Sequence, residues 1–180
     1  AMRAGVDLDS LAMGEKKRGQ SSIKWGMGSA SQNLHSMKTI HKSVLIWFSA
    51  EEMFRLVTDV PSYPQFLPWC EKSAIRDTFA DGMVAEIGMS LGGFRKSFTT
   101  RNAHIPGRQV KLTLVDGPFK QLEGTWDFIP LAEGQRACRV ELTLNYSFES
   151  MFGALVGPLF DRIASTLVDA FVKRAEQIYT

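Results

Sequence analysis

The sequence predicts an α+β domain in which a curved antiparallel sheet is covered on one side by a long C-terminal helix. Six segments of alternating apolar and polar residues follow one another between residues 71 and 148, with glycine-containing turns between them. A helical apolar pattern follows after Phe152. One apolar and one polar face indicate an antiparallel sheet covered on one side, not a doubly wound parallel sheet.

The first strand is predicted over residues 40–47, which are apolar and rich in β-branched side chains. The start of a helix follows, because Ser49 and Glu52 form an S-x-x-E capping box whose side chains satisfy backbone N–H groups. Phe48 and Met53 have the spacing of the hydrophobic staple that fixes the entry of the chain into a helix.

This first helix is expected to be short, because Pro61 and Pro64 follow it closely. The aromatic-rich run 63–70 is expected to form a turn or a second short helix. Alternation and turn residues then predict six strands, over residues 71–79, 83–91, 94–104, 108–115, 119–129 and 136–148.

The C-terminal region is predicted to supply the helix that covers the sheet. Apolar residues recur at close to 3.6-residue spacing from Leu155 to Ile178. Gly157-Pro158 interrupts the start of this pattern, so the regular helix is expected from about Pro158 to Tyr179. A helix of about 22 residues is about 33 Å long and can cross the whole sheet.

The chain is predicted to divide into a disordered leader or tail, residues 1–36, and one folded domain, residues 37–180. The first part has no sustained period and many Gly and Ser residues, so burial would not offset the entropy of ordering it. It lacks the apolar segment of a secretory signal and the Arg-rich composition of a mitochondrial presequence, which favours an expression leader or an upstream start codon.

Charge and motif content argue against several function classes. The chain has 21 Lys+Arg and 19 Asp+Glu, but the basic excess lies in the first 38 residues and the remainder carries −1. A broad basic surface for nucleic acid is therefore not predicted. A local basic cluster remains as a candidate, formed by Arg95, Lys96, Arg101, Arg108 and Lys111.

No catalytic or metal-binding residue is predicted from the motifs of the chain. The three histidines and two cysteines lack the spacing of a metal site, and the cysteines allow at most one disulfide. The chain has no nucleophile elbow, P-loop or dinucleotide-binding fingerprint. Its 12 Phe and 4 Trp residues either fill the core or line an elongated cavity between helix and sheet, and both readings stay open.

The run from Asp59 to Cys70, DVPSYPQFLPWC, resembles the signature of the coenzyme Q-binding and ribosome-association toxin (RatA-like) family. The segment 170–175, AFVKRA, with Tyr179 soon after it, is similar to the family's C-terminal motif. The resemblance covers residues 37–180. It implies the helix-grip fold of the START-like (polyketide cyclase/dehydrase and lipid transport) superfamily. That fold has a curved antiparallel sheet of about seven strands wrapped around a long C-terminal helix, two short helices after strand one, and a hydrophobic tunnel.

The resemblance also implies function, with three alternatives. We expect non-enzymatic binding of a polyprenyl quinone, ubiquinone, in support of respiratory electron transport or quinone biosynthesis, because an apolar tail suits an apolar tunnel. The first alternative is a toxin that binds the large ribosomal subunit and blocks subunit joining. The second is an aromatase/cyclase-like enzyme, although no acid–base pair is detectable in register.

The expected ligand-binding residues lie in the 63–70 segment, on facing strands and on the C-terminal helix: Phe66, Pro68, Trp69, Cys70, Phe94, Phe119, Trp126, Phe160 and Phe171. No cofactor is expected other than ubiquinone as the bound ligand. The expected partners are a polyprenyl quinone, a membrane surface contacted peripherally or the large ribosomal subunit, and not DNA. The expected location is the cytoplasm, with peripheral attachment to the inner membrane.

Overall fold

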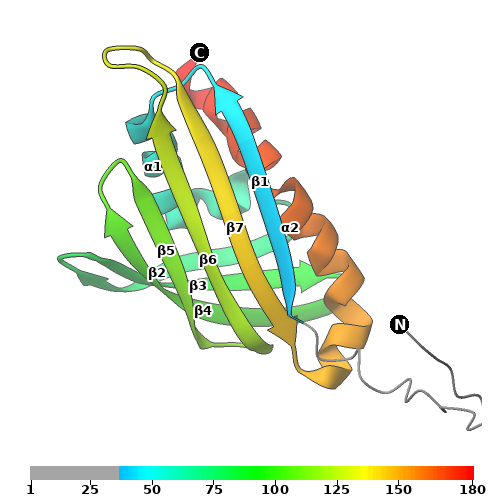
Figure 1. The fold of residues 1–180 in the computed structure, drawn as a ribbon. Helices are drawn as coiled ribbons and strands as arrows, with labels where there is room; N and C mark the ends of the chain where they lie inside the picture. Colours follow the sequence, from blue (N-terminus) through cyan, green and yellow to red (C-terminus); the bar gives the residue numbers. More distant parts are fainter. Residues whose placement is uncertain (1–36) are drawn as a thin grey trace, which may run out of the picture. The chain divides into compact units, whose positions relative to one another are not determined.

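The computed structural model describes residues 37–180, so the predicted leader lies outside the described residues. It confirms the helix-grip architecture of one antiparallel sheet and a long C-terminal helix (Figure 1). The elements in chain order are β1 (Lys38–Ile46), α1 (Ala50–Thr58), the 3₁₀ helix η1 (Val60–Gln65), β2 (Cys70–Phe79), β3 (Gly82–Leu91), β4 (Phe94–Ile105), β5 (Gln109–Asp116), β6 (Phe119–Pro130), β7 (Cys138–Phe148) and α2 (Ser150–Tyr179).

The strands form a single sheet in the order β1-β7-β6-β5-β4-β3-β2. Every strand from β2 to β7 pairs with its chain neighbour, and β1 pairs antiparallel with β7 at the far edge. Register shifts interrupt the β2–β3, β4–β5 and β6–β7 pairs, and such bulges bend and twist the strands that carry them. In Figure 1 the strands β2, β3 and β4 consequently turn behind β5, β6 and β7 and run across them.

The inner face of the sheet holds the core, as the alternation of the sequence predicts. On β3 the inward residues Met83, Ala85 and Ile87 are buried, and on β7 every second residue from Cys138 to Phe148 is buried. Apolar side chains that stand on one face of a pleated strand stabilise the fold by leaving water together. This face is covered by α1, η1 and α2.

The predicted capping box is present at the start of α1. The backbone N–H of Glu52 donates to Ser49 Oγ at 3.1 Å, and that of Ser49 donates to Glu52 Oε2 at 2.8 Å. Phe48 and Met53, the predicted staple residues, are both buried in the core around this helix. The local signals therefore define how the chain leaves β1 and enters the layer that covers the sheet.

The start of the C-terminal helix differs from the prediction, because α2 begins at Ser150 and Pro158 lies inside it. Proline removes one backbone hydrogen bond and crowds the preceding turn. Packing of the first turns offsets this cost: Phe152 lies against Phe148 with ring centroids 5.7 Å apart, and Val156 is fully buried. Met151–Tyr179 has the length and apolar content of a membrane-crossing helix, but Val168 and other residues pack against the sheet, as in a core helix.

Candidate functional site

An apolar cavity lies between α2 and the concave face of the sheet, with a volume of about 90 Å³. The segment before β2 contributes Val57, Val60, Tyr63, Leu67 and Trp69. Helix α2 contributes Phe160, Ile163, Ala164, Leu167 and Phe171. The sheet contributes Ala85, Ile87, Phe98, Thr100, Asn102, Leu112, Leu122, Trp126 and Leu144.

The size of the cavity limits what it holds in this conformation. A single water needs roughly 10–15 Å³ measured in the same way, so the cavity has room for one small ring or a few waters. A long polyprenyl chain does not fit inside it unless the surrounding elements move. The structure therefore has a small cavity in the place where the family resemblance implies a hydrophobic tunnel.

The cavity lies where two groups of buried residues meet. One group surrounds α1 and the C-terminal half of α2, and the other surrounds the N-terminal half of α2. Trp69 and Phe98 pack against both groups and line the cavity. Because Trp69 is only half-buried, its indole lies between the cavity and the solvent.

Aromatic rings in edge-to-face contact form one end of the cavity. The ring of Phe171 lies 5.4 Å from Tyr63, 5.1 Å from Phe66 and 5.1 Å from Trp126, measured between centroids, and all three contacts are edge-on. Such pairs stabilise beyond the area that they bury and restrict ring orientation. This end of the cavity is consequently held rigidly by neighbouring rings.

The structure brings four of the nine predicted ligand residues together on the cavity wall, namely Trp69, Trp126, Phe160 and Phe171. Phe66 lies behind Phe171, and Phe119 lies behind Phe98 and Phe160. The other three do not line the cavity. Pro68 is exposed, Phe94 is exposed at the start of β4, and Cys70 is buried at the start of β2. A role of any of these residues in ligand binding stays a prediction.

The lining residues that were absent from the sequence-based prediction include two polar ones, Thr100 and Asn102 on β4. They are only 4% and 5% exposed, and the Thr100 hydroxyl donates to Asn102 Oδ1 at 2.6 Å. The alternation within 94–104 does carry a signal for them, because Phe98, Thr100 and Asn102 share one face of that strand. Thr100 and Asn102 are the polar residues among the sheet side chains that line the cavity, and they mark a position that packing alone does not explain.

Tyr63 and Cys70, the ionisable groups near the cavity, are protonated and hydrogen-bonded to the backbone. The hydroxyl of Tyr63 donates to the carbonyl oxygen of Val57 at 2.5 Å, and burial raises the pKa of this phenol above its usual value. Burial also raises the pKa of the Cys70 thiol, whose sulfur donates to the Lys72 carbonyl at 3.3 Å. Burial raises the pKa of the free Cys138 to about 11. Neither cysteine is therefore a ready nucleophile at neutral pH.

The described part of the chain, residues 37–180, contains no group of three or more His, Cys, Asp or Glu side chains that could hold a metal ion. The predicted basic cluster is partly neutralised, because Arg95 pairs with Glu71 at 3.1 Å and Arg101 pairs with Asp81 at 2.6 Å. An uninterrupted basic stripe is consequently not formed by these strands.

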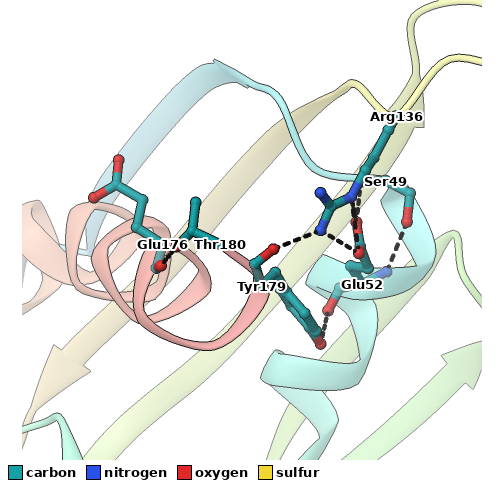
Figure 2. A network of polar contacts seen from close by, with 6 residues as sticks. All are labelled: Ser49, Glu52, Arg136, Glu176, Tyr179 and Thr180. Atoms are coloured by element: carbon teal, nitrogen blue, oxygen red, sulfur yellow. Dashed lines mark hydrogen bonds and ion pairs between the residues drawn. The ribbon is translucent and has the colours of Figure 1, made fainter.

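A set of polar contacts ties the C-terminal end of α2 to the start of α1 (Figure 2). The guanidinium of Arg136 donates to both carboxylate oxygens of Glu52 at 2.7–3.0 Å and to the carbonyl oxygen of Tyr179 at 3.0 Å. The Tyr179 hydroxyl donates to the Glu52 carbonyl at 3.1 Å. We call Ser49, Glu52, Arg136 and Tyr179 the C-terminal clamp. The hydrogen bond from Arg136 lowers the pKa of Glu52, so this contact persists at neutral pH.

The opposite end of α2 exposes apolar side chains. Met151 is 83% exposed and Leu159 is 41% exposed, and Leu155 and Phe94 are also exposed. The β3–β4 turn lies next to this helix end, because a Cβ atom on Gly92 would lie 3.1 Å from Leu159 Cδ1. We call Phe94, Met151, Leu155 and Leu159 the apolar end.

Together, the fold and the cavity define a helix-grip protein with an internal apolar site. A sequence profile of the family described as polyketide cyclase/dehydrase and lipid transport matches residues 46–172, and the chain belongs to this family. The crystal structure of the ZhuI aromatase/cyclase from a Streptomyces species superposes with a TM-score of 0.69 at 17% identity, covering 79% of this chain and 95% of that one. That similarity concerns the fold.

Relatives with higher sequence identity have names that point to two different functions. A Vibrio cholerae protein named ribosome association toxin RatA is 46% identical over 79% of this chain and 99% of its own length. The RatA of Escherichia coli K12 is 42% identical over 80% of this chain and 90% of its own length. The Xenopus laevis mitochondrial protein named coenzyme Q-binding protein COQ10 homolog B is 30% identical over 77% of this chain and 58% of its own length.

Proposed function

We propose that this protein binds a polyprenyl quinone stoichiometrically, with the quinone ring in the cavity and without chemical turnover. The observation that supports this proposal is a cavity lined by aromatic and aliphatic side chains with one polar pair, Thr100 and Asn102. Small-molecule sites are typically apolar with a few polar groups that orient the ligand. A relative named as a coenzyme Q-binding protein gives the ligand class.

The tail of such a ligand is expected to leave the cavity along α2 towards the apolar end. The cavity has room for a ring but not for the tail, so the tail needs an apolar path outside it. Met151, Leu155 and Leu159 offer exposed apolar area on the same helix. Peripheral contact of this end with the inner membrane would let a quinone pass from lipid to protein without crossing water.

Absence of turnover is supported by the groups that face the cavity. Tyr63 is the one titratable side chain of its lining, and its hydroxyl is engaged by the Val57 carbonyl. General acid–base catalysis needs a group whose pKa lies near the working pH and which can reach the substrate. A raised phenol pKa does not meet that requirement.

Association with the large ribosomal subunit is the second candidate function. The observation that favours it is the 40–46% identity to several bacterial proteins named ribosome association toxin, over 90–99% of their length. Charge gives it less support, because Arg95 and Arg101 are paired with carboxylates. Ribosome binding through phosphates would weaken steeply as salt concentration rises.

One preparation of the protein tests both candidates. Organic extraction followed by mass spectrometry should recover polyprenyl quinone near one equivalent per chain, and Trp69→Ala should abolish this recovery. Trp47→Ala is the matched control, because Trp47 is 82% exposed and does not line the cavity. Recovery of no quinone, together with co-sedimentation with large ribosomal subunits at moderate salt, would contradict the quinone proposal and support the second candidate.

A further inference from the structure

A buried polar pair interrupts the apolar wall of the cavity. Thr100 and Asn102 lie two residues apart on β4, so both side chains stand on its inner face. The Thr100 hydroxyl donates to Asn102 Oδ1 at 2.6 Å, and both residues are more than nine-tenths buried. Of the three buried polar residues among 37–180, these two line the cavity.

The strands on either side supply no polar partner on this face. Thr100 is paired across the sheet with Ala85 and Leu114, and Asn102 is paired with Met83 and Leu112. Burying an amide among apolar neighbours is unfavourable unless its hydrogen bonds are made. An apolar residue at position 102 would fit these surroundings better, so the pair is not explained by packing.

The hydrogen bond within the pair determines which group of the amide is left for a ligand. Thr100 uses its one donor on Oδ1, which orients the Asn102 amide and leaves its NH₂ group turned away from the hydroxyl. Within residues 37–180 the structure gives this NH₂ group no acceptor. The cavity therefore presents a hydrogen-bond donor, held by a neighbouring side chain, in an apolar setting.

We propose that Thr100 and Asn102 form a recognition subsite for a carbonyl oxygen on a flat apolar ring, with the Asn102 amide N–H donating to that oxygen. This inference rests on the proposed quinone binding and names the ligand group that the site recognises, a ring carbonyl. Thr100 positions the amide, and the apolar neighbours raise the cost of leaving its donor unpaired. A ligand of the same shape without oxygen satisfies the packing but leaves the amide unpaired, so the subsite selects a quinone over a hydrocarbon.

The test compares two probes that share a ten-carbon tail and differ in the ring, which carries two carbonyl, two methoxy and one methyl group in the first and none of these in the second. Decylubiquinone carries a quinone ring on a ten-carbon tail, and decylbenzene carries the same tail on a ring without oxygen. Isothermal titration calorimetry of the full chain should give a dissociation constant at least about tenfold lower for the quinone. Asn102→Leu should weaken quinone binding about tenfold and leave decylbenzene binding unchanged or tighter.

Two further variants locate the effect. Thr100→Val should weaken quinone binding by roughly threefold, because the amide keeps its donor but loses the group that orients it. Thr99→Val is the matched control, because neighbouring residues of a strand point to opposite faces and Thr99 therefore lies on the face away from the cavity. Its pairing partner Glu86 does not line the cavity either. This variant should bind both probes as the unmodified chain does.

The outcomes distinguish a failure of the proposed subsite from a failure of the proposed quinone binding. If the unmodified chain binds decylubiquinone and Asn102→Leu binds it equally well, the subsite is wrong and quinone binding stands. If the unmodified chain binds neither probe, quinone binding itself is refuted. Should Asn102→Leu fail to fold by circular dichroism, Asn102→Val replaces it, because valine suits a strand and has no side-chain hydrogen-bond donor. Unchanged selectivity in that variant would equally overturn the subsite.

Discussion

The two ends of α2 are held to the sheet in different ways. At the C-terminal end, Phe171 and Ala175 are buried, and the C-terminal clamp ties the last turn to α1. At the N-terminal end, Met151 and Leu155 are exposed and Pro158 interrupts the backbone hydrogen bonds. The cavity lies between these ends, so we expect a ligand larger than the cavity to be admitted by movement of the first turns of the helix.

This difference shows how one fold can combine stability with an adaptable site. The aromatic contacts of Phe171 and the clamp hold one end of the helix rigidly. At the other end Val156 and Phe160 are buried as well, so the interior Pro158 and the exposed first turn with Met151 and Leu155 are what lower the cost of local opening. Variants at the two ends should therefore differ in what they change: stability at the clamped end and ligand exchange at the apolar end.

The largest expected effect is the loss of stability in Phe171→Ala. The side chain is buried and contacts Tyr63, Phe66 and Trp126, so its removal should lower the free energy of unfolding by about 3–5 kcal/mol. Leu159→Ala, at the apolar end, should change it by less than about 0.5 kcal/mol. Urea denaturation measures both. Equal losses in the two variants would refute the comparison.

A ligand effect without a large stability effect is expected for Trp69→Ala. Because Trp69 is half-buried, its truncation should cost clearly less than the roughly 3–5 kcal/mol of a fully buried tryptophan. Quinone occupancy should nevertheless fall, since the indole lines the cavity. Thermal unfolding together with quinone extraction gives both quantities. A variant that is unfolded, or folded with full occupancy, contradicts this assignment.

A smaller effect is expected from breaking the cap at the clamped end. Ser49→Ala removes the acceptor for the Glu52 N–H and should lower stability by about 1 kcal/mol. Loss of this bond loosens the first turn of α1, which carries the Glu52 carboxylate bound by Arg136, so protection of the last turn of α2 from hydrogen exchange should decrease. Ser43→Ala, at an exposed residue of β1, is the control and should leave both quantities unchanged.

The smallest expected effect is a dependence of stability on pH caused by His104. Its Nε2 atom is buried without a hydrogen-bond partner, and burial, with the nearby charge of Arg101, lowers its pKa below the usual 6.5 while Asp81 opposes this. The unfolded chain therefore takes up the proton first, so stability should fall as pH decreases below about 6.5.

His104→Phe is expected to remove this dependence, because Phe54 already meets the imidazole edge-on at 5.6 Å and can meet a phenyl ring in the same way. Chemical denaturation between pH 7.5 and pH 5.5 measures how the free energy of unfolding changes with pH in the unmodified protein and in the variant. These limits lie on either side of the usual histidine pKa. The carboxyl of Glu52 loses its contribution at lower pH, because its pKa lies below 4.5. An equal pH dependence of the free energy of unfolding in the two proteins would show that a group other than His104 causes it.

Much of the fold was determined by local features of the sequence. The strand pattern from Cys70 to Phe148 follows from alternation over two residues, and the start of α1 follows from Ser49 and Glu52, which lie three residues apart. The segment 59–70 carried the family resemblance, and it contributes Tyr63, Leu67 and Trp69 to the cavity wall. Such short-range signals are readable because their physical causes act within one turn or one pleat.

The start of α2, the size of the cavity and the place of the polar pair were decided only by the tertiary structure. Pro158 predicts a helix start, yet Phe148 and Phe152 pack together from adjoining elements and extend the helix back to Ser150. Which aromatic rings line the cavity depends on contacts between distant segments, such as Tyr63 with Phe171. Because packing joins residues far apart in the chain, no local pattern distinguishes a ring in the wall of the cavity from one behind it.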